Sequence, residues 1–133
     1  MENTLGGLLP EALLIYLPEI DVQHEEIFRR IEALKNSSIG SGPVSLDESR
    51  SLLDYLEWHF ASEERIARQR GIDFVDHARA HDENLRTLRK ALAAVHEGSQ
   101  DVHSFLRYAE YWFERHITDE DKPFAARLRE AAA

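Results

Sequence analysis

The segment His77-Ala78-Arg79-Ala80-His81 places two histidines one helical turn apart, on the same face of a helix. They lie in a stripe of apolar residues that recurs every three or four positions: Phe74, Leu85, Leu88, Leu92 and Val95. The stripe predicts a bundle helix whose two histidines point into the core. Such a pair can chelate a transition metal, and buried imidazoles without polar partners are costly. The rest of the sequence should therefore supply further ligands at the same level.

The length and composition of the chain restrict its class. A chain of 133 residues suits one domain, and we expect an arm at 1–17, a bundle at 18–120 and a C-terminal segment at 121–133. The absence of cysteine excludes disulfides and thiolate metal ligands. A net charge of -9 argues against nucleic acid and anionic membranes as partners. The apolar stretch at 8–17 is short and lacks a basic leader, so we predict no signal peptide or membrane anchor, and a cytoplasmic location.

Capping and turn residues delimit the first two of four amphipathic helices. The first is expected to begin near Pro18 or Asp21, because proline suits the first turn and aspartate caps it. It should end before the Gly- and Ser-rich loop at 36–43. Ser45 and Glu48 then form a capping box that opens the second helix.

Glycines and aspartates delimit the other two helices. Gly71 should end the second helix and Asp73 should cap the third, which runs to Gly98. The fourth helix begins at 99–101, and Pro123 marks a break before a short helical tail. Short connections between four amphipathic helices predict an all-α fold, an antiparallel up-down-up-down four-helix bundle with an N-terminal arm and a short C-terminal helix.

Six side chains that can bind a metal lie on the predicted core stripes: His24, His59, Glu63, His77, His81 and His116. They stand near the starts of the first and third helices and near the ends of the second and fourth. In an alternating bundle these four places meet at one end. His96 and His103 flank the opposite loop beside the stripe, and we expect them at the surface. Five inward histidines and one glutamate at a single level favour a metal site over ordinary core packing.

Four segments carrying these residues resemble the ligand motifs of the hemerythrins, which are non-haem di-iron proteins that bind oxygen. The segments are Ile20-Asp21-Val22-Gln23-His24, His59-Phe60-Ala61-Ser62-Glu63, His77-x-x-x-His81 and His116-Ile117-Thr118-Asp119-Glu120-Asp121. The resemblance runs from about residue 18 to 128 and is strongest to the single-domain bacterial form of the family. Each motif alone is weak, but all four in this order are specific.

The resemblance implies a di-iron centre, in which two iron ions share a bridging oxo or hydroxo group. The implied ligands are His77, His81 and His116 on one iron, His24 and His59 on the other, and Glu63 and Asp121 as bridges between them. Two histidines in place of three leave the second iron with an open position. By resemblance, O2 or another small diatomic ligand binds there, and O2 leaves again unchanged.

The residues alone leave the second bridging carboxylate open between Glu120 and Asp121. On a straight helix, residues five apart diverge by about 140°, so Glu120, four residues after His116, is better placed. The family pattern instead selects Asp121, which requires a local widening of the helix such as a π-bulge. Pro123 donates no backbone hydrogen bond and favours such a disturbance.

A dry pocket should enclose the open position, so that water does not displace the bound ligand. The candidates to line it are Ile27, Phe60, Trp112, Phe113 and Ile117, which also serve as core residues. Phe113 stands where the family pattern has a leucine, and its larger side chain should narrow the pocket. Gln23 and Asp21 are candidates to orient a histidine ligand, with helix capping as the alternative role for Asp21.

The resulting hypothesis is an oxygen carrier, store or sensor and not an enzyme. Five neutral imidazoles and two carboxylates favour the diferrous state, whereas oxidase-type bundle sites carry four carboxylates and two histidines. The alternatives are a di-iron oxidase or peroxidase, a protein acting on nitric oxide, and an iron-dependent signalling module. An unidentified protein that donates or receives electrons is a further expected partner.

Overall fold

A computed structural model describes residues 9–40 and 46–132 of the chain. Its elements are η1 (Glu11–Leu13), α1 (Pro18–Gly40), α2 (Leu46–Arg70), α3 (Val75–His96), α4 (Val102–His116), η2 (Ile117–Asp121) and α5 (Lys122–Ala132). The element η1 is a 3-10 turn, and η2 is one turn of π-helix. None of the described residues lies in a β-strand, and none of the described helices is long and apolar enough to cross a membrane.

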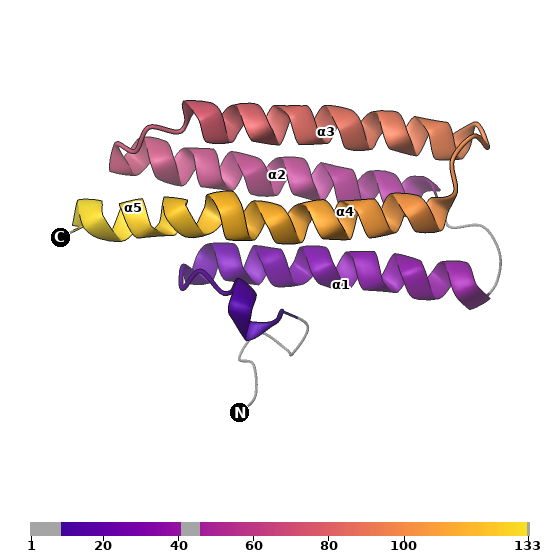
Figure 1. The fold of residues 1–133 in the computed structure, drawn as a ribbon, viewed down its shortest axis with the longest axis horizontal. Coiled ribbons are helices and arrows are strands. Elements are labelled where there is room, and N and C mark those ends of the chain that lie inside the picture. Colours follow the sequence, from indigo (N-terminus) through magenta and orange to yellow (C-terminus); the bar gives the residue numbers. More distant parts are fainter. Residues whose placement is uncertain (1–8, 41–45, 133) are drawn as a thin grey trace.

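The four long helices form a bundle in which α1 packs against α2 and α4, and α3 packs against the same two helices. Consecutive helices run in opposite directions, and the segment α4, η2 and α5 forms one continuous rod along the bundle (Figure 1). Apolar residues at helical spacing fill the interior, among them Ile27, Leu53, Leu88 and Phe105. The predicted all-α helical bundle is therefore confirmed.

The structure corrects one helix boundary. We expected the first helix to end before Asn36, but α1 continues to Gly40. Asparagine and serine disfavour a helix by only about 0.5 kcal/mol each, which an established helix with tertiary contacts easily overcomes. Lys35 of this helix donates to Glu110 of α4 at 2.6 Å, and this contact holds α1 against α4. The predicted cap Ser45 lies outside the described residues.

The other predicted boundaries agree closely with the structure. Gly71 and Gly98 follow α2 and α3 with φ angles of 69° and 84°, a left-handed conformation that glycine adopts without strain. The carboxylate of Asp73 accepts from the backbone N–H of Val75 at the start of α3. Asp101 caps α4 by accepting from the N–H of Ser104 at 3.0 Å.

The C-terminal helix α5 continues the line of α4 and covers the end of the bundle at which η2 lies (Figure 1). Phe124 and Leu128 are almost fully buried, and each such side chain contributes about 1.5–3 kcal/mol through removal of apolar surface from water. Pro123 directly follows the π-turn within this continuous helical run, and it donates no backbone hydrogen bond to the turn before it. This packing holds the preceding π-turn in place.

The N-terminal arm is held against α1 by two carboxylates. Asp21 accepts from the backbone N–H groups of Ile15 and Leu17 at 2.9 and 3.2 Å. Glu25 accepts from the N–H of Leu9 at 2.9 Å. The expectation that Asp21 orients a histidine is therefore wrong, because both of its oxygens face the arm. Its role is closer to the capping alternative, since it satisfies N–H groups at the start of α1.

Candidate metal centre

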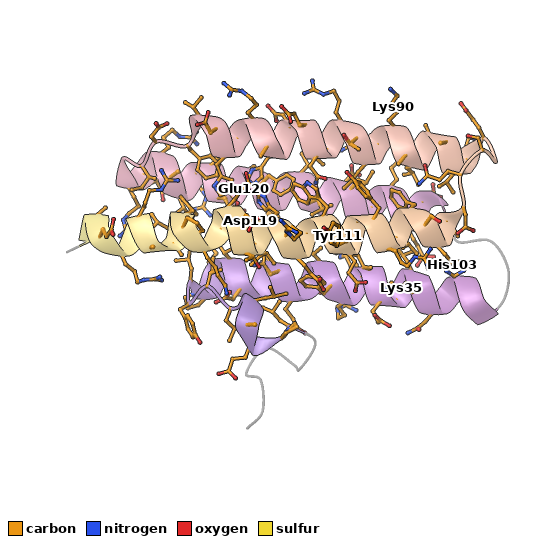
Figure 2. The ribbon with its side chains drawn as sticks, viewed as in Figure 1. Lys35, Lys90, His103, Tyr111, Asp119 and Glu120 are labelled. Carbon is orange, nitrogen blue, oxygen red and sulfur yellow. The ribbon has the colours of Figure 1, made fainter. Side chains whose placement is uncertain are left out.

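Seven buried side chains from the four helices and η2 meet at one end of the bundle. They form two overlapping groups, one of Glu63, His77, His81, His116 and Asp121, the other of His24, His59, Glu63 and Asp121. Within each group the possible ligand atoms all lie within 4.8 Å of one another. Six of them are the residues that the sequence placed at a common level, and the seventh, Asp121, is the carboxylate that the family pattern implied. His96 and His103 belong to neither group, and His103 lies toward the far end of the bundle from Glu120 (Figure 2).

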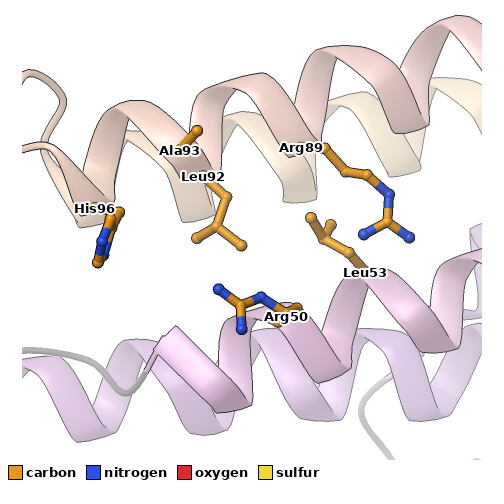
Figure 3. A pocket seen from close by; sticks show the side chains of 6 residues that line it. All are labelled: Arg50, Leu53, Arg89, Leu92, Ala93 and His96. Atoms are coloured by element: carbon orange, nitrogen blue, oxygen red, sulfur yellow. The ribbon is translucent and has the colours of Figure 1, made fainter.

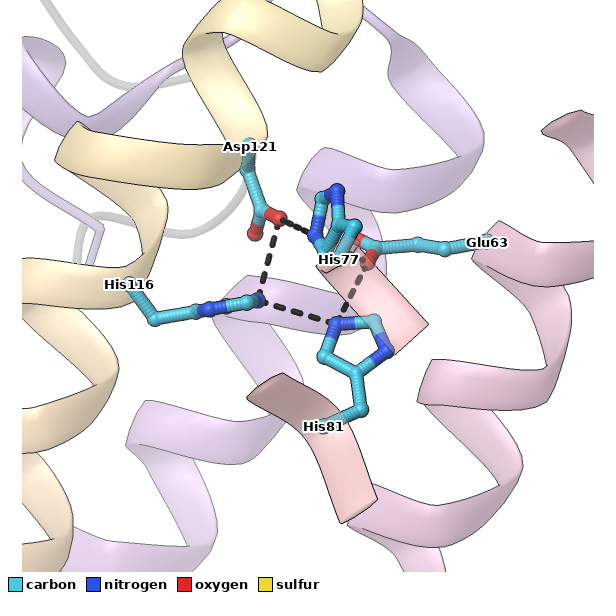
Figure 4. A group of neighbouring side chains, drawn as sticks. All are labelled: Glu63, His77, His81, His116 and Asp121. Atoms are coloured by element: carbon cyan, nitrogen blue, oxygen red, sulfur yellow. Dashed lines mark hydrogen bonds and ion pairs between the residues drawn. The ribbon is translucent and has the colours of Figure 1, made fainter. Parts of the chain in front are cut away.

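The first group is compact around three imidazole nitrogens (Figure 4). His81 Nε2 and His116 Nε2 are 3.0 Å apart, and Asp121 Oδ1 lies 3.0 Å from His77 Nε2 and 3.1 Å from His116 Nε2. Glu63 Oε1 lies 3.2 Å from His81 Nε2. Three nitrogens and two carboxylate oxygens therefore converge on one point.

The second group uses the other oxygen of each carboxylate. Glu63 Oε2 lies 3.8 Å from His24 Nε2 and 3.5 Å from His59 Nε2, while Asp121 Oδ2 lies 3.1 Å from His24 Nε2. Each carboxylate thus presents one oxygen to each group. This arrangement suits two cations held side by side by the same pair of carboxylates.

The π-turn η2 decides which acidic residue reaches the centre. Hydrogen bonds from residue i to i+5 widen the helix at Ile117–Asp121, which brings Asp121 onto the inner face below His116. The Asp121 side chain is fully buried, whereas the Glu120 side chain is 35% exposed. Glu120 therefore stands outside both groups, and the widening of the helix expected from the family pattern is present.

The outer nitrogens of two of the five imidazoles donate hydrogen bonds to side chains outside the two groups. His59 Nδ1 donates to Gln23 Oε1 at 2.6 Å, and His116 Nδ1 donates to the carboxylate of Glu120. A proton held on Nδ1 leaves the Nε2 lone pair free to face the centre. The orienting role was expected for Gln23 but missed for Glu120, although the spacing of four residues after His116 placed the two side chains together.

Phe113 encloses the side of the centre that carries two histidines. Its ring meets those of His24 and His59 edge-on, with centroid distances of 5.1 and 5.8 Å. Ile27 and Ile117 are fully buried in the same core. A side chain smaller than that of Phe113 would therefore leave free space beside His24 and His59.

Phe60 and Trp112 lie instead against the three-histidine side. The Phe60 ring stacks on His81 at 3.8 Å, and the half-buried Trp112 stacks on His116 at 4.6 Å. Phe74, predicted only as a core residue, stacks in the same way on His77 at 4.3 Å. These rings limit the rotation of three imidazoles and keep water from their faces.

Several buried polar atoms of the centre have no hydrogen-bond partner, although they approach one another closely. They are His24 Nδ1 and Nε2, His59 Nε2, Glu63 Oε1 and Oε2, and Asp121 Oδ2. An unsatisfied buried polar group typically costs about 1–3 kcal/mol, so such a concentration of them is unusual for a packed core. Imidazole and carboxylate lone pairs directed at the same two points fit a pair of metal cations.

In the ion-free protein, protons supply the positive charge that the two carboxylates require. Burial acts to lower the pKa of His24, but the charges of Asp121 and Glu63 outweigh it and raise the pKa to about 9. Burial likewise opposes protonation of His116, yet Asp121 and Glu120 raise its pKa to about 10. A bound metal would displace these protons.

These shifts predict how the stability of the ion-free protein depends on pH. Folded His24 and His116 keep their protons to about pH 9 and 10, whereas unfolded histidines lose them near 6.5. Their stabilisation is fully present below pH 6.5 and is lost as the pH rises through the folded pKa values. The free energy of unfolding should therefore fall by about 1.4 kcal/mol per pH unit for each excess proton in this window.

Urea unfolding followed by circular dichroism at pH 6.5 and 9 measures this effect. The metal-loaded protein should show little of the loss, because cations replace the protons at the carboxylates. An ion-free protein of equal stability at both pH values would contradict the assignment of the protons to His24 and His116.

Comparisons with known proteins agree with this geometry. The Hemerythrin HHE cation binding domain family matches residues 17–128. The chain is 28% identical over 105 residues to a bacteriohemerythrin of Methylococcus capsulatus, and the match covers 77% of this chain and 80% of the relative. No solved structure matches the chain significantly. Because the family match spans most of its length, the chain belongs to the hemerythrin family.

Proposed function

We propose that the chain holds two iron ions and binds O2 reversibly at one of them. The proposed ligands are those of the two groups: His77, His81 and His116 for one ion, His24 and His59 for the other, with Glu63 and Asp121 shared. Family membership and the name of the Methylococcus capsulatus relative support the assignment. The donor set also suits iron, which accepts both imidazole and carboxylate ligands.

The observation that carries the proposal is the unequal division of ligands between two groups that share both carboxylates. Three histidines serve one group and two serve the other, so the position beside His24 and His59 has one protein donor fewer. A metal site that keeps an open position can bind an external molecule, whereas a saturated site is structural. An ion held by His24 and His59 would therefore have its open position on the side that Phe113 encloses.

The iron pair, when bound, supplies the electrons that bind O2. The protein orients His59 through Gln23 and His116 through Glu120, and it excludes water with apolar rings. Its five neutral imidazoles and two carboxylates leave the centre less negative than the four-carboxylate sites of other di-iron bundles. This donor set favours the reduced state and the return of electrons. Phe113 offers no proton beside the open position, which disfavours reductive cleavage of O2.

The test is a cycle of oxygenation with a metal count. The purified protein should contain two irons per chain, become coloured when the reduced form meets O2, and lose the colour again under inert gas over several cycles. Metal analysis and visible absorption spectroscopy measure these outcomes. A single iron in fully loaded protein, or immediate irreversible oxidation with consumption of a co-substrate, would overturn the proposal.

A further inference from the structure

A groove between α2 and α3 reaches from the surface to His81, a side chain of the proposed centre. It encloses about 230 Å³, and its floor includes Phe60 and Phe74 together with His81. Both phenylalanines are largely buried, at 4% and 8% exposure, so the groove cuts into the bundle at the level of the centre. The function proposed for the centre requires metal to reach this interior, which close packing otherwise seals.

His81 is the polar group at the floor of this groove. It is only 3% exposed, and its Nε2 faces Glu63 and His116 inside the centre. Across residues 9–40 and 46–132, nothing forms a hydrogen bond or ion pair with its other ring nitrogen. The groove therefore ends on a side chain of the centre whose outer nitrogen is unpartnered.

The mouth of the groove carries unpaired negative charge and small side chains. Glu64 of α2 and Asp82 of α3 line it, and neither makes an ion pair within the described part of the chain. Glu57, also at the mouth, is instead neutralised by Arg89 at 2.9 Å. Ala61 and Ala78 line the groove from opposite helices and leave it open, since a methyl group fills little of the space.

The far end of the same helix pair provides a natural comparison. A second cavity of about 220 Å³ lies there between α2 and α3 (Figure 3). Its lining includes the basic residues Arg50, Arg89 and His96 around Ala93 and no acidic residue, and Arg89 is paired with Asp54 and Glu57. The two cavities therefore have similar size, but only the one that reaches His81 has unpaired carboxylates in its lining.

We propose that the acidic groove is the port through which ferrous ion enters and leaves the centre. Glu64 and Asp82 raise the local concentration of cations at the mouth, since a cleft lined by one sign of charge focuses the field. His81 is the side chain of the centre that an ion meets below them. This inference rests on the proposed function of the centre, but it concerns the rate of filling and not the affinity.

The test follows the uptake of Fe²⁺ by the ion-free protein without oxygen. Trp112 stacks on His116, so its fluorescence should be quenched as the centre fills. Combining Glu64→Gln with Asp82→Asn should slow uptake at low salt by about tenfold and weaken its salt dependence. Combining Ala61→Leu with Ala78→Leu should slow both uptake and removal of iron by bipyridine by about tenfold or more. The final iron content should stay at the wild-type value in both variants.

Matched controls come from the far end of the helices. Ala93→Leu narrows the basic cavity, and Asp47→Asn with Glu97→Gln removes the same charge as the port variant. These chains should fill at the wild-type rate. Equal rates in the port variants, or equal slowing in the controls, would overturn the port while leaving the centre in place. A wild-type chain that takes up no iron would overturn the proposed function as well.

Discussion

Replacing His81 by alanine should abolish stable iron binding, and His77→Ala should do the same. His81 Nε2 lies 3.0 Å from His116 Nε2 and 3.2 Å from Glu63 Oε1. Its loss therefore removes one of the three imidazole nitrogens of the first group. Loss of a residue that only supports a ligand typically weakens metal binding by about 10–100-fold, and loss of a ligand should exceed this. The substitution also leaves a cavity beneath Phe60, into which water can enter.

Iron content after gel filtration and the visible spectrum of the oxygenated protein measure the result. The controls are His96→Ala and His103→Ala, which remove an imidazole elsewhere and should retain both irons and the spectrum. Helical circular dichroism should be preserved in all four variants, because the core beyond the centre is apolar. A His96→Ala protein without the iron spectrum would contradict the assignment of the centre to one end of the bundle.

The second large effect is expected for Asp121→Asn. Asp121 is fully buried, presents one oxygen to each group, and contributes to the raised pKa values of His24 and His116. Its amide analogue lacks the negative charge and one of the two acceptors, so both proposed iron positions should weaken together, by more than about 100-fold. The protein should then hold neither iron, or hold iron without the coupling of a bridged pair.

Glu120→Gln is the matched comparison, because it removes the same charge from the adjacent residue. Among the described residues, the hydrogen-bond partner of the Glu120 carboxylate is the outer nitrogen of His116, and Glu120 is partly exposed. Its loss should therefore weaken iron binding by about tenfold and keep the pair intact. Isothermal titration with Fe²⁺ under inert gas and Mössbauer spectroscopy distinguish the two variants. If Glu120→Gln proves the more damaging, the bridging role belongs to Glu120.

Local patterns in the sequence were sufficient to predict the helices and the level of most proposed ligands. Helical periodicity is a property of neighbouring residues, so the stripes identified which face each helix buries. Short connections then required alternating directions, which placed His24, His59, His77 and His116 at one end. The glycines after α2 and α3 also have a purely local reason, since glycine adopts the left-handed turn at each helix end without strain.

Only the tertiary structure decided the features that depend on distant contacts. The helix α1 continues into the expected loop as far as Gly40, because an established helix held by Lys35 and Glu110 outweighs weak local propensity. The Asp21 side chain faces the arm and not a histidine, because the backbone N–H groups of Ile15 and Leu17 lie beside it and donate to it. Neither partner could be read from helical spacing.

At the centre, too, the choice between Asp121 and Glu120 depends on the tertiary structure and not on local spacing. Spacing on a regular helix favours Glu120, yet the structure contains a π-turn that carries Asp121 inward and leaves Glu120 outside against His116. The turn is held by contacts on both sides, with Phe124 packed in the core beyond it. By itself, the sequence determined which faces are apolar and at which level the imidazoles lie, because both follow from short-range periodicity. The direction of each carboxylate oxygen depends on packing between helices, and only the folded bundle specifies it.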